Sequence, residues 1–354
     1  MEITCAGNVR RNEDKMSKIL NVLYQSDDNY ALPTGISMLS LFENNKHLDE
    51  INIYYLDDCI SEKNIAKLKK IAEDYGRNLV FLDTTNTLKR LKELNVTPYK
   101  NTYTTYFKLL TIKDLDLPTD RILQIDGDTI INLPLDELIE MDLEGHICAA
   151  TYASILNEYK EMIGIDANDK YYNCGVLMIH QKYWREHDCE KQILDHLLHK
   201  RNRYFIVDQD IINILFRDNI KYMHIKFNFN SGWYIYGLDE SIKIYNFKDQ
   251  YYSTRQQIEE AMAKPYIDHC MGAMTGRPWE KNNIHPQNDN FNKYLAMSPW
   301  TEDDKLEVRR GFMFRAQKRL YLMLPKCIYW RIHRIALKRY MKKMNAATLV
   351  ESAQ

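Results

Sequence analysis

The sequence has 354 residues and a net charge of −1, and 45% of its residues are hydrophobic and 27% charged. These values are ordinary for a globular protein, and the length suits one large α/β domain with a small appendage. Seven cysteines without a Cys-x-x-Cys pair argue against a disulfide framework or a structural zinc site and fit a reducing cytosol. We find no secretion signal and no run near the ~20 apolar residues of a membrane span.

Strand and helix patterns alternate from residue 19 onward. Short apolar runs predict strands at 19–25, 51–58, 79–84 and 121–128, and helical patterns lie between them at about 33–42, 61–75 and 103–115. This alternation predicts an α/β fold with a single, mostly parallel central sheet and flanking helices. Ligands bind such sheets beyond the carboxyl ends of the strands. Acidic clusters follow the first strand at 27–29 and the fourth at 126–128.

The second half of the chain is less regular. We expect strands at 171–180, 222–225 and 266–270 and helices at 182–199 and 208–217. We find no internal repeat and no low-complexity linker. Residues 19–300 are therefore interpreted as one catalytic domain, preceded by an N-terminal extension (1–18) and followed by a basic, amphipathic helical tail (301–354).

Asp126-Gly127-Asp128 is the first candidate site. Carboxylates one residue apart point the same way at the end of a strand, and glycine between them lets a ligand approach the backbone. Such a pair suits Mg²⁺ or Mn²⁺, which bridge phosphate oxygens. The plain alternative is a solvated turn. With Thr129 the pattern also resembles the nucleophile motif of haloacid-dehalogenase-type phosphatases, but that motif usually follows the first strand of the fold.

Further polar residues occur in or beside the later elements. Asp208 and Asp210 can be explained as acids at a helix N-terminus, but Gln209 between them cannot. Asn173 interrupts an apolar strand and needs hydrogen-bond partners if it is buried, so a structural role is the alternative.

His269 ends a predicted strand, and Arg277 follows it. A lone histidine is usually structural, but a histidine joined to two carboxylates makes a nitrogen–oxygen site that suits Mn²⁺. Arginine binds diphosphate in a bidentate manner.

In this order the motifs resemble glycosyltransferase family 8, which contains retaining enzymes such as bacterial lipopolysaccharide galactosyl- and glucosyltransferases. The match covers about residues 19–300. Its six motifs are the turn Asp27-Asp28-Asn29-Tyr30, the Thr-Thr-Tyr helix ending at Lys108, Asp126-x-Asp128, the strand Tyr172–Val176, Asp208-Gln209-Asp210, and His269-x-x-Gly272 followed by Arg277-Pro278-Trp279.

The resemblance implies a GT-A nucleotide-sugar-binding fold, a Mn²⁺ cofactor with Mg²⁺ as the alternative, and a UDP-hexose donor. The implied metal ligands are Asp126, Asp128 and His269. The implied donor-binding residues are Asp27 and Asn29 at the uridine or ribose, Lys108, Gly127, Asn173, Gly272 and Arg277, together with both metal-binding aspartates. The implied catalytic residues are Asp208 and Gln209.

Three positions depart from the family pattern. Lys108 replaces the usual arginine, the spacing from Gly272 to Arg277 is longer than usual, and Ala153 stands where relatives often carry an aspartate. We expect these departures to affect the diphosphate contacts and the choice of donor or acceptor.

The implied reaction is retaining transfer of glucose or galactose to a saccharide or lipid-linked acceptor in surface-glycan or lipopolysaccharide synthesis. Retaining glycosidases use a carboxylate nucleophile, whereas Gln209 is an amide and a poor nucleophile. This difference favours front-face displacement through an oxocarbenium-like ion pair. The alternatives are a phosphatase that uses Asp126 and Asp128, and a catalytically weak UDP-sugar-binding protein.

The tail is strongly basic. Residues 308–345 contain twelve Lys and Arg and no Asp or Glu, interleaved with aromatic and aliphatic residues. Pro325 is expected to divide this segment into two helices. Such helices bind anionic membrane surfaces, which predicts a cytoplasmic protein on the inner face of the cell membrane. The alternatives are docking onto the acidic body and, less favoured, a nucleic-acid patch; no nucleic-acid partner is expected.

Overall fold

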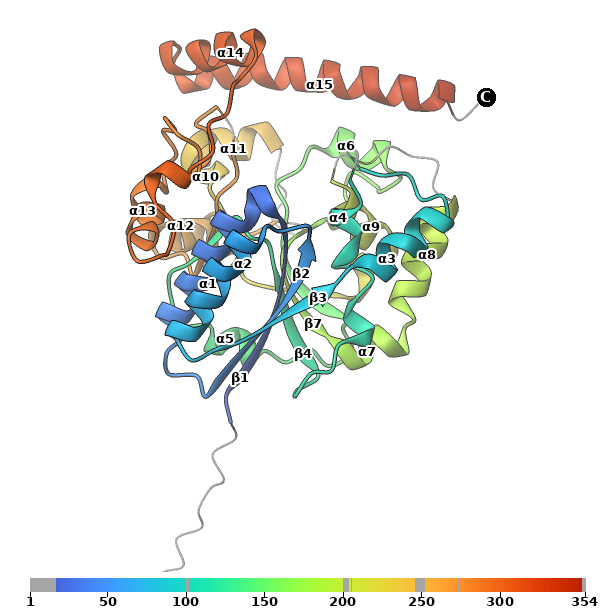
Figure 1. Ribbon diagram of the computed structural model, residues 1–354. Coiled ribbons are helices and arrows are strands. Elements are labelled where there is room, and N and C mark those ends of the chain that lie inside the picture. The colour runs from blue at the N-terminus through green and yellow to red at the C-terminus, as the bar shows by residue number, and fades with distance from the viewer. Residues whose placement is uncertain are drawn as a thin grey trace, which may run out of the picture.

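A computed structural model describes residues 17–99, 102–199, 204, 206–245, 252–272 and 274–351. The remainder of the expected N-terminal extension, residues 1–16, lies outside the described residues. A twisted sheet forms the centre of the molecule, and helices cover both of its faces (Figure 1). Two C-terminal helices cross the side on which the carboxyl ends of the parallel strands lie.

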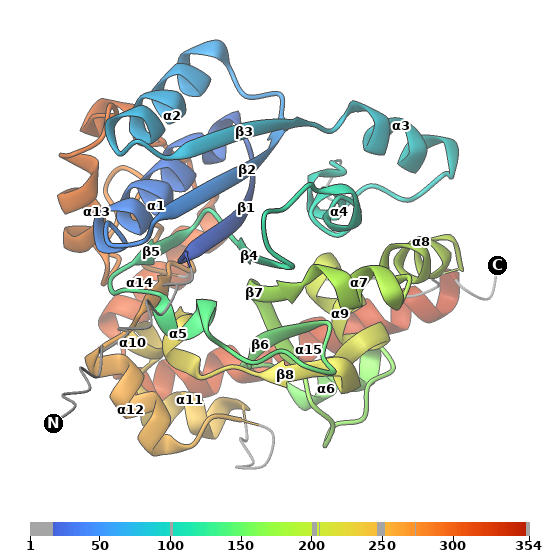
Figure 2. The ribbon, with the colours of Figure 1, turned by 90° about the horizontal axis from the view of Figure 1, so that it is seen from below.

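The described residues form a seven-stranded sheet with the order β3-β2-β1-β4-β7-β6-β8. Its strands are β1 (Ile19–Asp27), β2 (Glu50–Asp58), β3 (Asn78–Asp83), β4 (Arg121–Ile125), β6 (Cys148–Tyr152), β7 (Tyr172–His180) and β8 (Ile220–Tyr222). All neighbours are parallel except at β7, which runs antiparallel to both β4 and β6. The mostly parallel sheet expected from the sequence is thus confirmed, and Figure 2 shows its strands in this order.

The helices are α1 (Ala31–Asn44), α2 (Glu62–Asp74), α3 (Thr85–Glu93), α4 (Thr104–Phe107), α5 (Asp136–Ile139), α6 (Asn157–Met162), α7 (Gln181–Glu186), α8 (Cys189–His199), α9 (Val207–Phe216), α10 (Gly232–Tyr236), α11 (Leu238–Tyr245), α12 (Arg255–Ala263), α13 (Asn288–Leu295), α14 (Phe312–Met323) and α15 (Lys326–Glu351). The ends of α2 follow from local chemistry. The Ser61 side chain accepts a hydrogen bond from the Asn64 N–H at its start, and Gly76 takes a left-handed conformation (φ +58°) beyond its end.

Two of the expected helices are wrong in extent. The pattern at 103–115 gives only the single turn of α4 and a 3-10 turn at Ile112–Asp114. The pattern at 182–199 is divided into α7 and α8, because Asp188 between them has a left-handed backbone (φ +48°). Apolar spacing of about 3.6 residues continued across both breaks, so periodicity alone could not reveal them.

A second, small sheet of three strands lies outside the central sheet and was not expected from the sequence. In the described residues its order is β5-β10-β9, formed by β5 (Thr129–Ile131), β10 (Ile267–His269) and β9 (Phe229–Asn230). β10 pairs antiparallel with β5, and His269 lies opposite Thr129. These strands are two or three residues long, too short for a sequence pattern to predict their pairing. The small sheet brings the end of β10 next to Asp128.

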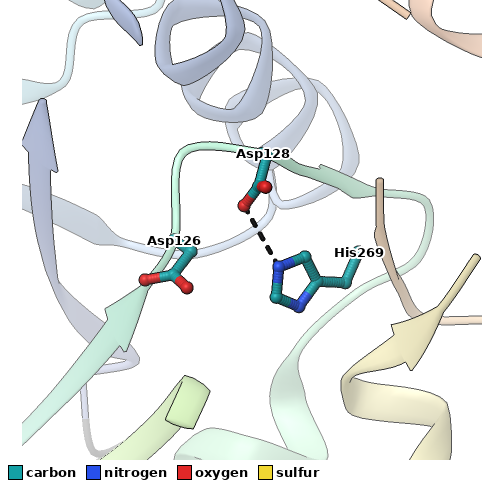
Figure 3. A group of neighbouring side chains, drawn as sticks. All are labelled: Asp126, Asp128 and His269. Atoms are coloured by element: carbon teal, nitrogen blue, oxygen red, sulfur yellow. Dashed lines mark ion pairs between the residues drawn. The ribbon is translucent and has the colours of Figure 1, made fainter. Parts of the chain in front are cut away.

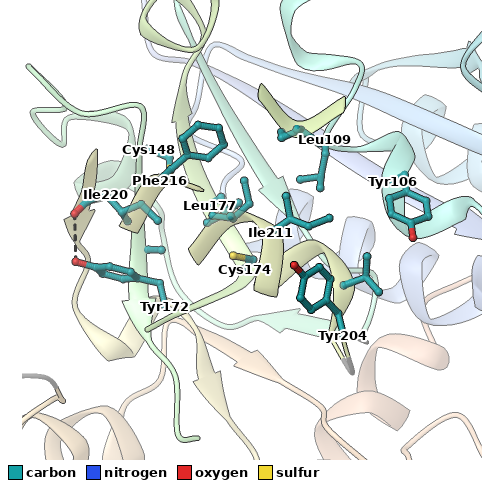
Figure 4. Packing of buried hydrophobic residues seen from close by; sticks show 14 of the residues in the cluster. Tyr106, Leu109, Cys148, Tyr172, Cys174, Leu177, Tyr204, Ile211, Phe216 and Ile220 are labelled. Carbon is teal, nitrogen blue, oxygen red and sulfur yellow. Dashed lines mark hydrogen bonds between the residues drawn. The ribbon is translucent and has the colours of Figure 1, made fainter. Parts of the chain in front are cut away.

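The core lies on both faces of the large sheet, because successive strand residues point to opposite sides. Leu20, Val22 and Tyr24 of β1 pack beneath α1 and α2, whereas Leu23 faces the cluster under α4 and α7–α9. Figure 4 shows part of this second cluster, including Cys174. Each fully buried aliphatic side chain contributes about 1.5–3 kcal/mol of apolar burial, so the sheet is a rigid support for the loops at its edge.

The C-terminal segment forms two helices, as the proline predicted: α14 ends at Met323 and α15 begins at Lys326. One face of α15 packs on the body, where Trp330 is 2% exposed and its ring centroid lies 4.1 Å from that of Tyr236. Lys338 pairs with Glu158 on α6. Within the described residues, no helix is both long and apolar enough to cross a membrane.

Candidate active site

The Asp126–Asp128 turn joins β4 to β5 at the carboxyl edge of the large sheet. The Asp126 N–H donates to the Gly175 carbonyl (2.8 Å), and the Cys270 N–H donates to the Asp128 carbonyl (2.7 Å), so the turn is fixed at both ends. A Cβ on Gly127 would overlap the Thr34 side chain of α1. The glycine is therefore explained by close packing of α1, a reason that the sequence did not reveal.

Asp126, Asp128 and His269 meet at this turn (Figure 3). Their ligand atoms all lie within 4.8 Å of one another, and they form the only such His, Cys, Asp or Glu group in the described part of the chain. His269 Nε2 lies 3.1 Å from Asp128 Oδ1. Two carboxylates and an imidazole suit a divalent cation. The structure therefore brings together the three residues that were expected to bind a metal.

The orientation of His269 is fixed by its surroundings. Its Nδ1 lies 2.9 Å from Asn228 Oδ1, which favours the tautomer with Nε2 directed at the carboxylates. Asn228 in turn donates to Asn173 Oδ1 (2.8 Å), which also accepts from the Gly175 N–H (2.8 Å). A Cβ on Gly175 would overlap the His269 ring. Asn173 thus supports the histidine through Asn228, a residue that sequence reasoning missed because its partners are distant in the chain.

The two aspartates differ in their electrostatics. Burial alone would raise the pKa of Asp128, but His269 and Arg277 outweigh it and lower this pKa to about 2. Burial also acts on Asp126 and, despite the nearby Lys108 ammonium, its pKa is raised. Asp128 is therefore the firmly ionised member of the pair.

Lys108 connects two parts of the expected site. It is buried, and its Nζ lies 2.9 Å from Asp126 Oδ1 and 2.6 Å from Asp208 Oδ2. Burial would lower the pKa of this ammonium, but the two carboxylates raise it, so it stays charged. Lys108 therefore links the Asp126–Asp128 turn to the start of α9.

The start of α9 brings Asp208 and Gln209 to the same edge. Gln209 is buried, where its Oε1 accepts from the Cys174 N–H (3.2 Å) and its Nε2 donates to the Tyr171 hydroxyl (3.2 Å). Asp210 accepts a hydrogen bond from the same hydroxyl (2.5 Å). Asp210 is thus structural, whereas Asp208 reaches Lys108 at the site.

Arg277 lies on the other side of Asp128. Its Nη1 is 3.3 Å from Asp128 Oδ2 and also donates to the Tyr30 hydroxyl. The guanidinium lies 5.6 Å from the Tyr30 ring centroid and 5.2 Å from that of Trp279, which favours cation–π attraction. A Cβ on Gly272 would lie 2.6 Å from Arg277 Cγ. The longer spacing between Gly272 and Arg277 therefore still places them in contact.

An open cleft of about 350 Å³ adjoins the acidic turn. Its lining residues are Gln25, Ser26, Asp27, Tyr30, Tyr99, Thr102, Thr104, Thr105, Asp126, Gly127 and Asp128. Asp27 accepts from the Tyr30 N–H (3.0 Å), and Asn29 donates to Asp27 (3.4 Å) without lining the cleft itself. The hydroxyl groups of Ser26, Tyr99 and Thr102 also line the cleft, and none of these residues belongs to the motifs found in the sequence.

A twisted α/β sheet with an Asp-x-Asp turn, a neighbouring histidine and a cleft at the carboxyl edge is an arrangement that fits a glycosyltransferase. The family model described as glycosyl transferase family 8 matches residues 21–283. The chain therefore belongs to glycosyl transferase family 8 and is a glycosyltransferase, as the resemblance predicted. The phosphatase alternative finds no support.

Known proteins agree with this assignment. Lipopolysaccharide 1,2-glucosyltransferase from Escherichia coli K12 is 25% identical over 305 residues, which cover 84% of each chain. General stress protein A from Bacillus subtilis is 24% identical and covers 81% of this chain and 96% of its own. The structure of galactosyltransferase LgtC in complex with donor and acceptor sugar analogues is 22% identical, covers 84% of this chain and 99% of LgtC, and has a TM-score of 0.63. The expected GT-A fold is confirmed.

Proposed function

We propose that the enzyme transfers glucose or galactose from a UDP-sugar, with retention of configuration, to a saccharide or lipid-linked acceptor in lipopolysaccharide or surface-glycan synthesis. The proposal rests on the convergence of Asp126, Asp128 and His269 beside the cleft. The names of the relatives support it, since they include lipopolysaccharide glucosyl- and galactosyltransferases.

Asp126, Asp128 and His269 are proposed to bind Mn²⁺, with Mg²⁺ as the alternative. The nitrogen ligand supports this choice, because imidazole suits a transition metal better than Mg²⁺. When bound, the ion supplies electrostatic stabilisation for the charge that develops on the leaving diphosphate. The negative charge of Asp128, held by Arg277, makes this residue the main anchor.

The other donor contacts are proposed to surround this centre. Arg277 would bind the diphosphate with its guanidinium, and Gly272 leaves room for its side chain. Asp27 and Asn29 would contact the ribose or uracil. The backbone at Gly127 would pass beneath the diphosphate. Lys108 and Asn173 would hold Asp208 and His269, respectively, at the donor sugar.

Asp208 and Gln209 are proposed as the catalytic residues, acting at the sugar face of the site. The Gln209 amide is held by Cys174 and Tyr171, and an amide is a poor nucleophile. We therefore favour front-face displacement, in which the leaving phosphate accepts the proton of the acceptor hydroxyl. Gln209→Ala should slow turnover far more than it weakens UDP binding. Equal losses would make Gln209 a binding residue, and a trapped sugar adduct on Asp208 would contradict front-face displacement.

Residues 19–300 are proposed as the catalytic unit and 301–354 as a tail that meets an anionic membrane surface through residues 308–345. Exposed apolar side chains of the tail support the membrane contact. Phe312 and Met313 are 75% and 79% exposed, and many Lys and Arg residues lie near them in the sequence. The proposed location is the inner face of the cell membrane. The inner face of α15 packs on the body through Trp330 and Tyr236, which leaves its outer face for the proposed membrane contact.

The test is a donor screen. UDP-glucose, UDP-galactose and their N-acetyl forms are each incubated with the full-length enzyme, and UDP release is measured with Mn²⁺, with Mg²⁺ and with EDTA. We expect one hexose donor to be preferred, with the greatest release in Mn²⁺ and none in EDTA. Release that persists in EDTA would refute the metal-dependent reaction, and UDP-sugar binding without release or transfer would identify a binding protein.

A further inference from the structure

A basic groove of about 290 Å³ lies outside the active site, between the loop at 275–283 and the segment that leads into α14. Its charged lining residues are Lys281, Arg309, Arg310, Arg315 and Lys318, with Glu280 and Glu307. The groove therefore carries an excess of positive charge. One cation comes from the loop at 275–283, and the others come from the segment that leads into α14 and from α14 itself.

One of these cations has a structural explanation. Arg310 Nη2 lies 2.5 Å from Glu280 Oε1, and its guanidinium is 4.9 Å from the Phe314 ring centroid. This ion pair attaches the start of the tail to the loop and neutralises the nearly buried Glu280. Arg310 thus shapes the groove and is not available to a ligand.

The other cations have no such explanation. Among the described residues, Lys281, Arg309, Arg315 and Lys318 form no ion pair, and Glu307 is the remaining carboxylate of the lining. Like charges around one hollow create a positive potential, which would stabilise an anion bound between them. A phosphate group matches them best, because its oxygens accept bidentate hydrogen bonds from arginine and further bonds from lysine.

The groove is next to the catalytic centre. Thr275 and Gly276 line it, whereas Arg277, the following residue, reaches Asp128 in the active site. Gly276 has a left-handed backbone (φ +77°), which lets the loop turn between the two sites. A phosphate in the groove would thus be separated from the donor site by one loop.

Exposed apolar side chains lie beside the groove. Phe312 and Met313 begin α14 next to the lining residues Arg310 and Arg315. α14 lies on the side of the molecule where the carboxyl ends of the parallel strands and the active site lie (Figure 1). Cations next to exposed apolar side chains suit the headgroup region of a lipid layer.

We propose that this groove binds a phosphate group carried by the glycolipid acceptor or by the membrane lipids around it. The inference rests on the proposed transfer to a lipid-linked acceptor, and it adds a phosphate requirement that the catalytic residues do not supply. The groove would hold the acceptor lipid while its sugar extends towards Arg277 and the cleft.

The test compares two variants with the same change of charge. Arg315→Glu/Lys318→Glu alters the groove, and Arg331→Glu/Arg339→Glu alters exposed cations of α15 away from it. Binding to phosphatidylcholine vesicles with and without phosphatidylglycerol, and to inorganic diphosphate in solution, is measured for each full-length protein at fixed salt. UDP release from the UDP-hexose is measured in parallel.

We expect the groove variant to lose at least about tenfold in affinity for the anionic vesicles or for diphosphate, and the α15 variant to lose clearly less. A loss for vesicles alone identifies a lipid headgroup, and a loss for diphosphate identifies a phosphate recognised without a bilayer. Equal losses in both variants, or no binding of either probe by the unchanged protein, would overturn the proposal. UDP release by the unchanged protein tests the proposed reaction on its own, so a failure of the groove is distinguished from a failure of that reaction. If the groove variant misfolds, Arg315→Gln/Lys318→Gln replaces it.

Discussion

Three glycines at the site are explained by the space that neighbouring side chains occupy. Gly127, Gly175 and Gly272 belong to motifs that the sequence associates with ligands, yet each glycine leaves room for a side chain of the protein. The side chains are Thr34, His269 and Arg277, respectively. The order of the motifs placed these glycines at the site, whereas the side chains that they contact could be identified only from the structure.

Gly175→Ala tests this at the metal site. The added methyl group would push the His269 ring away from Asp128, and a displaced ligand typically costs about 10–100-fold in metal affinity. Gly311→Ala is the control, because no atom lies within 4 Å of its added Cβ. The measurement is the Mn²⁺ concentration that gives half-maximal UDP release. Unchanged metal dependence in Gly175→Ala would show that the ring position is not critical.

His285 predicts a dependence of stability on pH. It is buried, and its Nδ1 accepts the Gln287 N–H (3.1 Å), so the ring is neutral in the folded protein. Burial lowers its pKa to about 4. Because the unfolded histidine titrates near 6.5, its contribution to folding is complete above pH 6.5 and is lost as the pH falls towards 4, by up to about 3 kcal/mol. His285→Gln should show a smaller loss between pH 7 and 4.5 in urea unfolding; an equal loss in both proteins would contradict this.

At the scale of elements, the sequence predicts strands and helices well where apolar periodicity is long. β1, β2, β7 and α2 lie close to the expected ranges. β10 lies within the strand expected at 266–270, but β5, β9 and the pairing of the three strands could not be predicted, because strands of two or three residues have no periodic pattern and are held by tertiary contacts. The pairing of β10 with β5 brings His269 next to Asp128, so the contact that the sequence missed is the one that brings together the candidate metal ligands.

Trp330 tests whether α15 belongs to the body. It is 2% exposed and packs against Tyr236, so Trp330→Ala should destabilise the protein by about 3–5 kcal/mol. Ile332 on the same helix is 51% exposed, and Ile332→Ala should change stability by no more than about 0.5 kcal/mol. Urea unfolding without lipid measures both. Similar small effects would show that α15 leaves the body in solution.

For the whole molecule, the site is assembled from segments that span most of the chain. The order of motifs predicts which residues belong to it, and the structure brings Asp126, Asp128 and His269 together. The ion pairs from Lys108 to Asp126 and Asp208, and the support of His269 by Asn228, could not be predicted because they join residues far apart in sequence. The sheet order and the small second sheet create these contacts.

The central claim is that Asp128 anchors a metal ion on which UDP-sugar turnover depends. Asp128→Asn keeps the size of the side chain but removes the charge that the cation needs. Its control is Asp268→Asn, one residue from His269 on the opposite side of β10, where Asp268 accepts a hydrogen bond from Asn132 (2.9 Å).

The most direct measurement is calorimetric titration of Mn²⁺ together with UDP release from the preferred UDP-hexose. Asp128→Asn should lose Mn²⁺ binding and at least about 100-fold of its turnover, the scale seen when a charge-stabilising group is removed, while Asp268→Asn keeps both. Mn²⁺-dependent UDP release that survives in Asp128→Asn would contradict the account.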